Sequence, residues 1–143
     1  MSKLEDELAL RGLMDRYIDA VARRDGTAWS GTWAEDASWS LMGQEVSGRD
    51  NLLALWQQMM SGFEFALMMP SSAMFEIDGD TASGHWYLQE FTRDLEGNAA
   101  NVLSRYRDTY VRVDGQWLYQ SRHYDVMYFG PADLSAPFNP LPE

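Results

Sequence analysis

The sequence predicts an α+β fold in which N-terminal helices pack on the concave face of a curved, mostly antiparallel sheet. Three observations lead to this prediction. Helical spacing of apolar residues is confined to the first 60 residues, long strand-like segments fill the following 68, and short turns separate those segments. Helices followed by strands that are joined by tight turns are typical of an α+β fold rather than of a parallel sheet.

The first helix is predicted to run from Ser2 to about Arg24. Ser2 followed by Glu5 is a capping-box pattern. Asp25 and Gly26 then end the helical pattern. Between these limits apolar residues recur at helical spacing and form one stripe: Leu10, Leu13, Met14, Tyr17 and Val21.

Shorter elements follow. Trp29 and Trp33 are one helical turn apart and predict a short second helix. Residues 37–41 alternate in polarity as a strand does, and Val46 belongs to a short return strand. Apolar residues at helical spacing over 52–60 predict a third helix, which Ser61 and Gly62 end.

Four long strands are predicted next, joined by turns such as Asp78-Gly79-Asp80 and Asp114-Gly115. A meander of this length twists and curls. With three helices on its concave face it can enclose a cavity, which is where a ligand would bind. Four prolines make the tail after Gly130 extended or irregular. The predicted strands are 63–77, 81–91, 102–113 and 116–128.

Length and composition predict one domain spanning residues 1–143. The chain is long enough for a sizeable core, and its 45% hydrophobic content is ordinary for a globular protein. No apolar run approaches the roughly 20 residues of a membrane span, so no membrane association is expected. The acidic N-terminus lacks the features of a signal peptide, which predicts a cytoplasmic protein.

Composition also excludes several kinds of site. The chain has no cysteine and two histidines, which argues against a metal centre, disulfides and a cysteine nucleophile. A formal net charge of −11 repels nucleic acid, so no nucleic-acid partner is expected. The sequence contains no phosphate-binding loop and no nucleophile elbow. We therefore expect no cofactor.

Several segments together resemble the SnoaL-like family of the nuclear transport factor 2 superfamily. The stretch RYIDAVARRDGTAWSGTWAEDASW is similar to the family's opening, and GRDNLLALW to its third helix. IDGDTASGHWYLQEF, RYRDTYVRVDGQWLY and RHYDVMYFG resemble the closing strands. The resemblance covers nearly the whole chain and implies the family's cone-shaped fold. It is weaker guidance to activity, because one fold hosts unrelated functions.

The resemblance also implies site residues. Related enzymes include scytalone dehydratase, bile-acid dehydratase and lindane dehydrochlorinase, in which a pocket histidine or carboxylate removes a proton from an apolar substrate. Tyr17 matches a pocket tyrosine of the dehydratases, and Trp39 a pocket tryptophan of the dehydrochlorinase. Glu90 falls near a pocket aspartate, and Arg122 at a pocket-lining position. These matches imply a cofactor-independent lyase or isomerase.

The family's catalytic histidine and its partner acid are replaced here. The resemblance places the histidine at Met68, whose thioether cannot act as a base, and the partner acid at Ala22. Asp25 takes the acid's place if the alignment slides by three residues, which is close to one helical turn. Asp25 is equally well suited to ending a helix, because Asp-Gly favours a turn.

Strand alternation sorts the residues of the second half into two faces. Trp86, Leu88 and Glu90 share one face, which predicts that Glu90 is buried and needs a partner. Arg122 is the predicted partner, in a pair that is either structural or an anchor for a ligand. The same alternation places both histidines, His85 and His123, on the outer face of the sheet.

Two functions remain open from the sequence. In the first, the chain is a lyase or isomerase for a small, hydrophobic, oxygenated ring compound. The predicted catalytic residues are Asp25, Glu90, Tyr17 and Arg122, and the predicted substrate-binding residues are Trp39, Met68, Trp86 and Leu88. In the second, the chain is a non-catalytic ligand-binding or assembly module. In either case a homo-oligomer, a dimer or trimer, is expected from the many aromatic residues on both strand faces.

Overall fold

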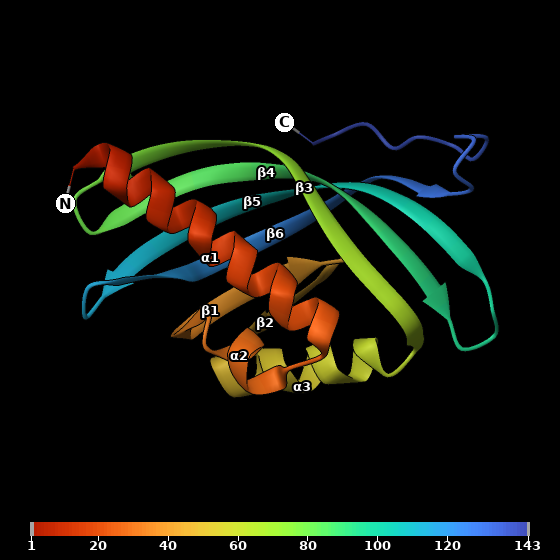
Figure 1. Ribbon diagram of the computed structural model, residues 1–143, viewed down its shortest axis with the longest axis horizontal. Helices are drawn as coiled ribbons and strands as arrows, with labels where there is room; N and C mark the ends of the chain where they lie inside the picture. The colour runs from red at the N-terminus through yellow and green to blue at the C-terminus, as the bar shows by residue number, and fades with distance from the viewer. Residues whose placement is uncertain (1, 143) are drawn as a thin grey trace.

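The computed structural model describes residues 2–142 and contains three helices and six strands (Figure 1). It confirms the predicted order of helices and strands, with one difference in the second helix. The elements are α1 (Lys3–Arg23), α2 (Gly26–Ser30), β1 (Trp33–Leu41), β2 (Gln44–Ser47), α3 (Arg49–Met60), β3 (Phe63–Asp78), β4 (Thr81–Asp94), β5 (Ala99–Val113) and β6 (Gln116–Gly130).

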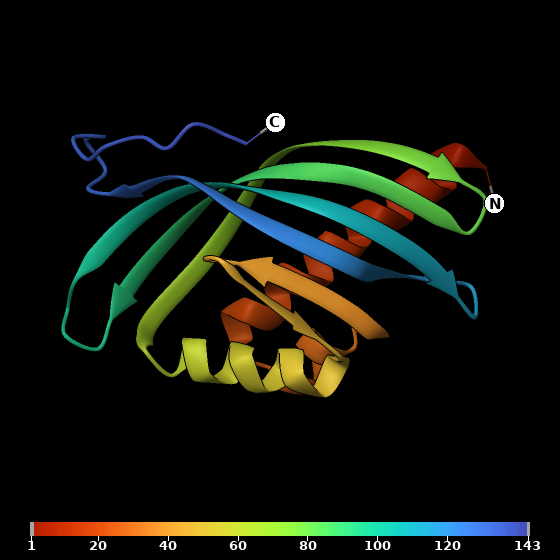
Figure 2. The ribbon, with the colours of Figure 1, turned by 180° about the vertical axis from the view of Figure 1, so that it is seen from behind.

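The six strands form one sheet in the order β2-β1-β6-β5-β4-β3. Neighbouring strands are antiparallel except for β1 and β6, which pair in parallel because the chain crosses from one edge of the sheet to the other between them. The long strands arch, and all three helices lie on the concave side of the arch (Figures 1 and 2). The sequence prediction of a curved, mostly antiparallel sheet covered by helices is therefore confirmed.

The ends of the helices follow the predicted capping chemistry. The Ser2 hydroxyl accepts a hydrogen bond of 3.1 Å from the amide of Glu5 at the start of α1. Arg24 ends α1 in a left-handed conformation with φ of 55°.

No helix among residues 2–142 is long and apolar enough to cross a membrane.

The prediction that Trp33 belongs to the second helix is wrong. The helix ends at Ser30, and Trp33 begins β1, fully buried. The ring centroids of Trp33 and Trp29 nevertheless lie 5.5 Å apart, because the chain turns sharply between the two residues. The two rings are neighbours in the aromatic core rather than on one helical face.

The tail after Gly130 returns over the convex side of the sheet (Figures 1 and 2). Phe138 forms an isolated β-bridge with Tyr128, and the two rings lie 5.2 Å apart. The amide of Asn139 donates a hydrogen bond of 2.8 Å to the carbonyl of Met127. The predicted irregular tail is thus fastened to the end of β6.

Gly84 is required by close packing between β3 and β4. A Cβ atom at this position would lie 2.4 Å from the carbonyl oxygen of Met74, closer than real Cβ atoms approach a backbone oxygen. We expect Gly84→Ala to lower the free energy of unfolding by about 1–3 kcal/mol. Urea unfolding followed by tryptophan fluorescence measures this change.

Gly12 in the middle of α1 provides the matched control. A Cβ atom there would meet only the Arg16 guanidinium, at 3.7 Å. Gly12→Ala should stabilise the protein by about 0.5–1 kcal/mol, because alanine favours a helix over glycine. Equal effects of the two substitutions would contradict the role assigned to Gly84.

Candidate functional site

An interior cavity of about 140 Å³ opens between the helices and the concave face of the sheet. Its walls are mostly apolar and come from α1, β1, α3 and the four long strands. Among residues 2–142 its lining contains one carboxylate, that of Glu90, and no Lys, Arg or His side chain. The apolar lining includes Val21, Trp39, Leu41, Trp56, Met68 and Val102, and the other polar lining residues are Tyr17, Thr92, Tyr106 and Tyr124.

Glu90 is held by two hydroxyl groups on neighbouring strands. Ser104 on β5 donates a hydrogen bond of 2.9 Å to its Oε2 atom, and Tyr124 on β6 donates a short one to the same atom. Within the described part of the chain, no hydrogen bond reaches Oε1. The carboxylate is therefore fixed through one oxygen, and the other is free to meet a ligand.

The protonation of Glu90 is set mainly by its burial. Burial raises the pKa of Glu90 above its ordinary value, while the hydrogen bonds from Tyr124 and Ser104 and the charge of Arg122 oppose the rise. A carboxylate with a raised pKa is a stronger base than one in water. The position combines a fixed geometry with increased basicity.

Tyr17 and Tyr106 bring a second polar group to the cavity. Their hydroxyl oxygens lie 3.4 Å apart and are buried. Burial raises the pKa of both phenols, so both stay neutral hydrogen-bond donors at ordinary pH. The pair can donate to an oxygen atom of a bound molecule.

Arg122 lies behind these tyrosines. Its guanidinium carbon is 3.7 Å from the ring centroid of Tyr106, 4.0 Å from that of Tyr119 and 4.6 Å from that of Tyr17. Two hydrogen bonds, of 2.8 and 3.1 Å, join it to the carboxylate of Asp108, and both side chains are fully buried. Arg122 therefore acts on the cavity through the tyrosine rings rather than by direct contact.

The predicted pairing of Glu90 with Arg122 is wrong. Asp108 lies directly opposite Arg122 in the β5–β6 register, whereas Glu90 lies opposite Val102 and Met68. β5 separates the strands that carry Glu90 and Arg122. The charge of Arg122 is consequently neutralised by Asp108. Glu90 is hydrogen-bonded instead by the hydroxyl groups of Ser104 and Tyr124.

Asp25 does not reach the cavity. It is the N-cap of α2, and its carboxylate accepts a hydrogen bond of 3.0 Å from the amide of Ala28. That bond lowers the pKa of Asp25, which is the opposite of what a base in an apolar cavity would show. Ala22 is exposed on α1. The structure thus supports the capping interpretation of Asp25.

The four predicted substrate-binding residues separate into two pairs. Trp39 and Met68 line the cavity. Trp86 and Leu88 are buried on the same face of β4 as Glu90 but are not among the lining residues. Trp86 lies further along the strand, where α1 covers the sheet and Arg11 stacks over the indole at 5.7 Å. These two residues belong to the core beside the cavity.

Sequence reasoning missed Ser104, Tyr106 and Tyr124 as site residues. Strand alternation contained part of the signal, because Ser104 and Tyr106 share a face and Tyr124 follows Arg122 by two residues. It did not give the register, which brings Ser104 and Tyr124 to Glu90 across three strands. Bulges in the β5–β6 pairing shift that register.

Comparison with known sequences identifies one matching family. A family model described as a SnoaL-like domain matches residues 2–123. A search of curated proteins by sequence found no match. The match leaves residues 124–143 outside, so that a single SnoaL-like domain over 1–143 stays a prediction.

Solved structures share the fold at low sequence identity. The candidate scytalone dehydratase from Novosphingobium aromaticivorans is 19% identical with a TM-score of 0.83, over 88% of this chain and 87% of that chain. The hexachlorocyclohexane dehydrochlorinase LinA-type3 from Novosphingobium barchaimii is also 19% identical, with a TM-score of 0.83 over 98% and 97%. A variant of Rv3472, a Mycobacterium tuberculosis protein of unknown function, is 22% identical with a TM-score of 0.80 over 87% and 77%. At these identities the likeness concerns the fold alone.

Proposed function

Because the chain belongs to the SnoaL-like family, we propose that it is a cofactor-independent lyase or isomerase. Its substrate is a small, hydrophobic ring compound that carries a carbonyl group. The observation that carries the proposal is the position of Glu90. It is a fixed carboxylate of raised pKa on the wall of an apolar cavity, with one oxygen free of protein hydrogen bonds in residues 2–142.

The reaction begins with a proton transfer. Oε1 of Glu90 removes a proton from the carbon next to the substrate carbonyl, and the electrons of the broken C–H bond pass into the carbonyl to form an enolate. In a dehydration the enolate then expels a hydroxyl group from the next carbon, and that group leaves as water with the proton from Glu90. In an isomerisation Glu90 returns the proton to a different carbon.

Neutral donors on the cavity wall favour the enolate. Tyr17 and Tyr106 present hydroxyl groups that can donate to the oxygen where negative charge develops. Arg122 behind their rings stabilises negative charge at that position without meeting the substrate. Trp39 adds a buried aromatic wall to the same cavity.

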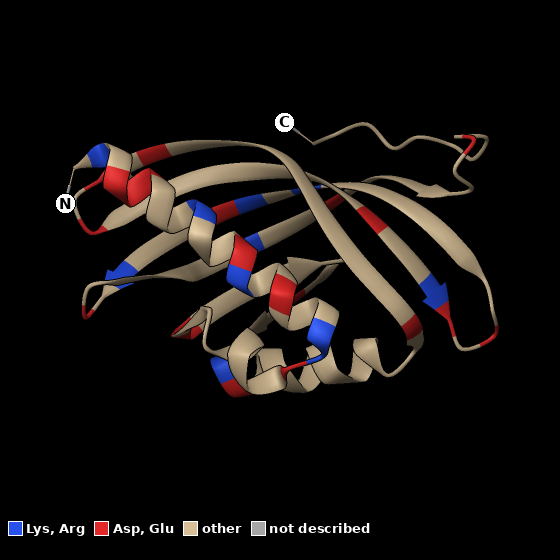
Figure 3. Ribbon diagram, viewed as in Figure 1, with Lys and Arg blue, Asp and Glu red and all other residues tan. Residues whose placement is uncertain are grey.

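The electrostatics of the cavity favour a neutral substrate. An anionic substrate would meet the Glu90 carboxylate without a Lys, Arg or His side chain of the described residues in the lining to balance it. The apolar walls would in turn remove water from any charged group, at a large cost in free energy. Charged residues lie along α1, at the turns between the long strands and within those strands (Figure 3), but among residues 2–142 Glu90 is the only one that lines the cavity.

A screen of neutral cyclic β-hydroxy ketones tests the proposal. Dehydration converts them to conjugated enones, whose ultraviolet absorbance reports turnover directly. We expect the wild-type protein to accelerate the dehydration of at least one compound of this class. Failure with the whole class, together with failure to isomerise the corresponding unconjugated enones, would contradict the proposed reaction.

Removing the Tyr124 hydroxyl should shift the pH dependence of activity. The hydrogen bond from Tyr124 lowers the pKa of Glu90 against the effect of burial, so Tyr124→Phe should raise that pKa further. Glu90 is a base only when it is ionised, and the acidic limb of the kcat/KM profile should therefore move to higher pH. Tyr87→Phe, on the other face of the sheet, is the control and should leave the limb in place. A shift to lower pH in Tyr124→Phe would contradict this assignment.

A second candidate function, a binding or assembly module, is favoured by the convex face of the sheet. No helix of residues 2–142 covers this face (Figure 2). Phe65, Met69 and Phe91 alternate along their strands with the inward-facing Met68 and Glu90 and are exposed. Aromatic and methionine side chains are enriched at protein interfaces. Light scattering distinguishes the cases, because a homo-oligomer formed through this face should dissociate when Phe91 is replaced by Lys. A monomeric wild-type protein would contradict the assembly version.

A further inference from the structure

The interior cavity adjoins a groove on the convex side of the sheet. The groove has a volume of about 660 Å³ and lies between the β1–β2 hairpin, the second half of β6 and the tail. Five residues line both hollows: Leu41, Met42, Tyr124, Val126 and Phe129. The same side chains therefore bound the cavity on one side and the groove on the other.

The two hollows adjoin where backbone pairing stops. The pairing of β1 with β6 ends at Ser40 and His123. Beyond that point β1 turns back into β2 through Met42 and Gly43, with φ of 51° and 78°, while β6 continues to Gly130. The two strands are not hydrogen-bonded over this stretch, so side chains rather than a backbone ladder close the sheet here.

Two side chains at this junction are apolar and exposed. Met42 is 76% exposed and Phe129 is 59% exposed, although both line the cavity. Neither is held by a backbone ladder between β1 and β6. Methionine is flexible and adapts to irregular ligands. The junction is thus closed by side chains, of which Met42 and Phe129 are exposed and can move aside.

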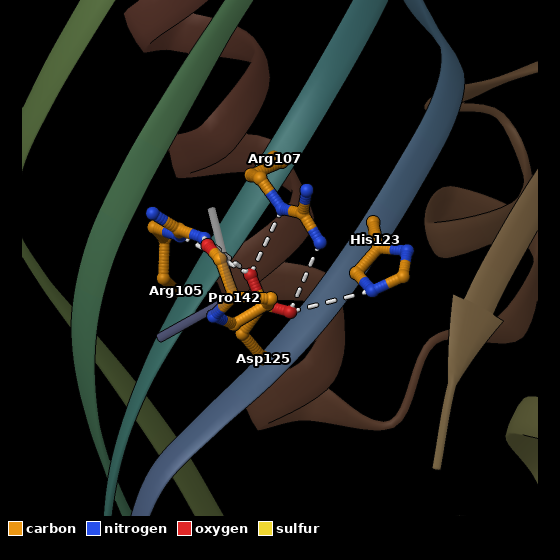
Figure 4. Close-up of polar contacts among 5 residues, drawn as sticks. All are labelled: Arg105, Arg107, His123, Asp125 and Pro142. Carbon is orange, nitrogen blue, oxygen red and sulfur yellow. Dashed lines mark hydrogen bonds and ion pairs between the residues drawn. The ribbon is translucent and has the colours of Figure 1, made fainter. Parts of the chain in front are cut away.

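The outer end of the groove is polar. Asp125 accepts hydrogen bonds from Arg105 and Arg107 and lies 3.3 Å from His123, and the carbonyl of Pro142 accepts a bond from Arg105 (Figure 4). Burial would raise the pKa of Asp125, but the bonds from Arg107 and Arg105 outweigh it and lower that pKa. Asp125 is therefore a carboxylate neutralised within the protein.

Other polar groups of the groove face solvent. They are the hydroxyl of Ser40, the amide of Gln44, the carboxylate of Glu45 and the half-exposed imidazole of His123. Glu45 and a net charge of −11 disfavour an anion. The arginines beside Asp125 disfavour a cation. A hydroxyl or amide group of a ligand suits this mixture of donors and acceptors.

Volume indicates that the two hollows are used together. Ligand pockets usually measure about 300–1,000 Å³. The interior cavity alone, at about 140 Å³, falls below this range, whereas the groove adds about 660 Å³. A substrate of ordinary size that reaches Glu90 must therefore extend past these side chains into the groove.

We infer that the groove is the entrance to the cavity and holds the polar end of the substrate. The substrate is then a two-part molecule, with an apolar ring next to Glu90 and an uncharged, hydrogen-bonding group among Ser40, Gln44 and His123. The inference rests on the proposed function in one respect, that the cavity is a ligand site. It adds the route of entry and the second half of the ligand.

A single-cysteine experiment tests the inference, because the chain has no cysteine of its own. Gln44 is exposed and lines the groove but not the cavity, so Gln44→Cys modified with N-cyclohexylmaleimide obstructs the groove alone. The control is Met74→Cys modified in the same way, since Met74 is 64% exposed on β3 and lines neither hollow. The probes are 2-naphthol and 6-hydroxy-2-naphthamide, followed by quenching of tryptophan fluorescence in a stopped-flow instrument.

The modified Gln44→Cys protein should bind 2-naphthol at least about tenfold more slowly than the modified control. The unmodified protein should bind the amide more tightly than 2-naphthol, and the groove adduct should abolish this preference. Equal association rates in the two adducts would overturn the entrance, and no preference for the amide would overturn the polar end. Absence of 2-naphthol binding to the unmodified protein would also overturn the inference.

Neither readout requires turnover, so the inference and the proposed function can fail separately. If ligands enter through the groove but no β-hydroxy ketone reacts, the proposed function fails and the entrance stands. If turnover depends on Glu90 but the two adducts bind 2-naphthol at equal rates, the inferred entrance fails and the proposed function stands.

Discussion

Replacing Glu90 with Gln is expected to lower kcat by about 10²–10⁴-fold, the usual contribution of a general base. The amide keeps the shape of the side chain and can still accept hydrogen bonds from Ser104 and Tyr124, which now hold Oε2 of Glu90. It cannot accept a proton from carbon. Steady-state kinetics on a β-hydroxy ketone that the wild-type protein dehydrates measures the loss. Retention of full activity would remove Glu90 from the mechanism.

The same substitution should not destabilise the protein at neutral pH. The folded-state pKa of Glu90 is raised above its unfolded value, so its contribution to stability is present below the unfolded pKa and lost as pH rises through the folded pKa. At about pH 8 the buried carboxylate is therefore unfavourable, and Glu90→Gln should be at least as stable as the wild type. This advantage should disappear by about pH 4. Urea unfolding at the two pH values provides the comparison and separates lost catalysis from lost folding.

The largest loss of stability is expected for Arg122→Met. Arg122 and Asp108 form a buried pair with two hydrogen bonds, and removing one partner of such a pair costs about 3–5 kcal/mol in free energy of unfolding. Burial already raises the pKa of Asp108, and the loss of Arg122 removes the main opposing influence. Asp108 should then become protonated at a higher pH. Equilibrium urea unfolding followed by tryptophan fluorescence measures the effect.

Two further variants show whether the buried charge is the cause. Combining Arg122→Met with Asp108→Asn removes both charges and should destabilise the protein by clearly less than the sum of the two single substitutions. Arg23→Met removes an exposed arginine that pairs with Asp19 and should leave stability unchanged within error. Additive effects of Arg122→Met and Asp108→Asn would contradict the interpretation of the pair.

Much of the fold could be predicted from the sequence, because the signals are local. Capping at Ser2, the apolar stripe of α1 and the turns at Gly79 and Gly115 all agree with the structure. Trp33 was misplaced because two tryptophans one turn apart suit a helix equally well. The sharp turn after Ser30 depends on tertiary packing of the aromatic core, which the local sequence does not contain.

The site was less accessible to sequence reasoning, because it depends on register across strands. Alternation placed Glu90 on the inner face, and the structure agrees. Alternation does not say which residue lies opposite another, however, and Arg122 meets Asp108 rather than Glu90. The resemblance placed Met68 at the family's histidine position, and Met68 lies directly opposite Glu90 on the cavity wall. The catalytic roles of Glu90, Tyr17 and Arg122 stay predictions.

Solvent exchange at carbon tests the central claim, that Glu90 removes a proton from a substrate carbon, most directly. A cyclic ketone without a leaving group is incubated in heavy water with the wild-type protein or Glu90→Gln, and proton NMR follows deuterium entering the position next to the carbonyl. We predict that the wild-type protein accelerates this exchange and that Glu90→Gln leaves it at the uncatalysed rate. Exchange that Glu90→Gln catalyses as fast as the wild type would contradict the account.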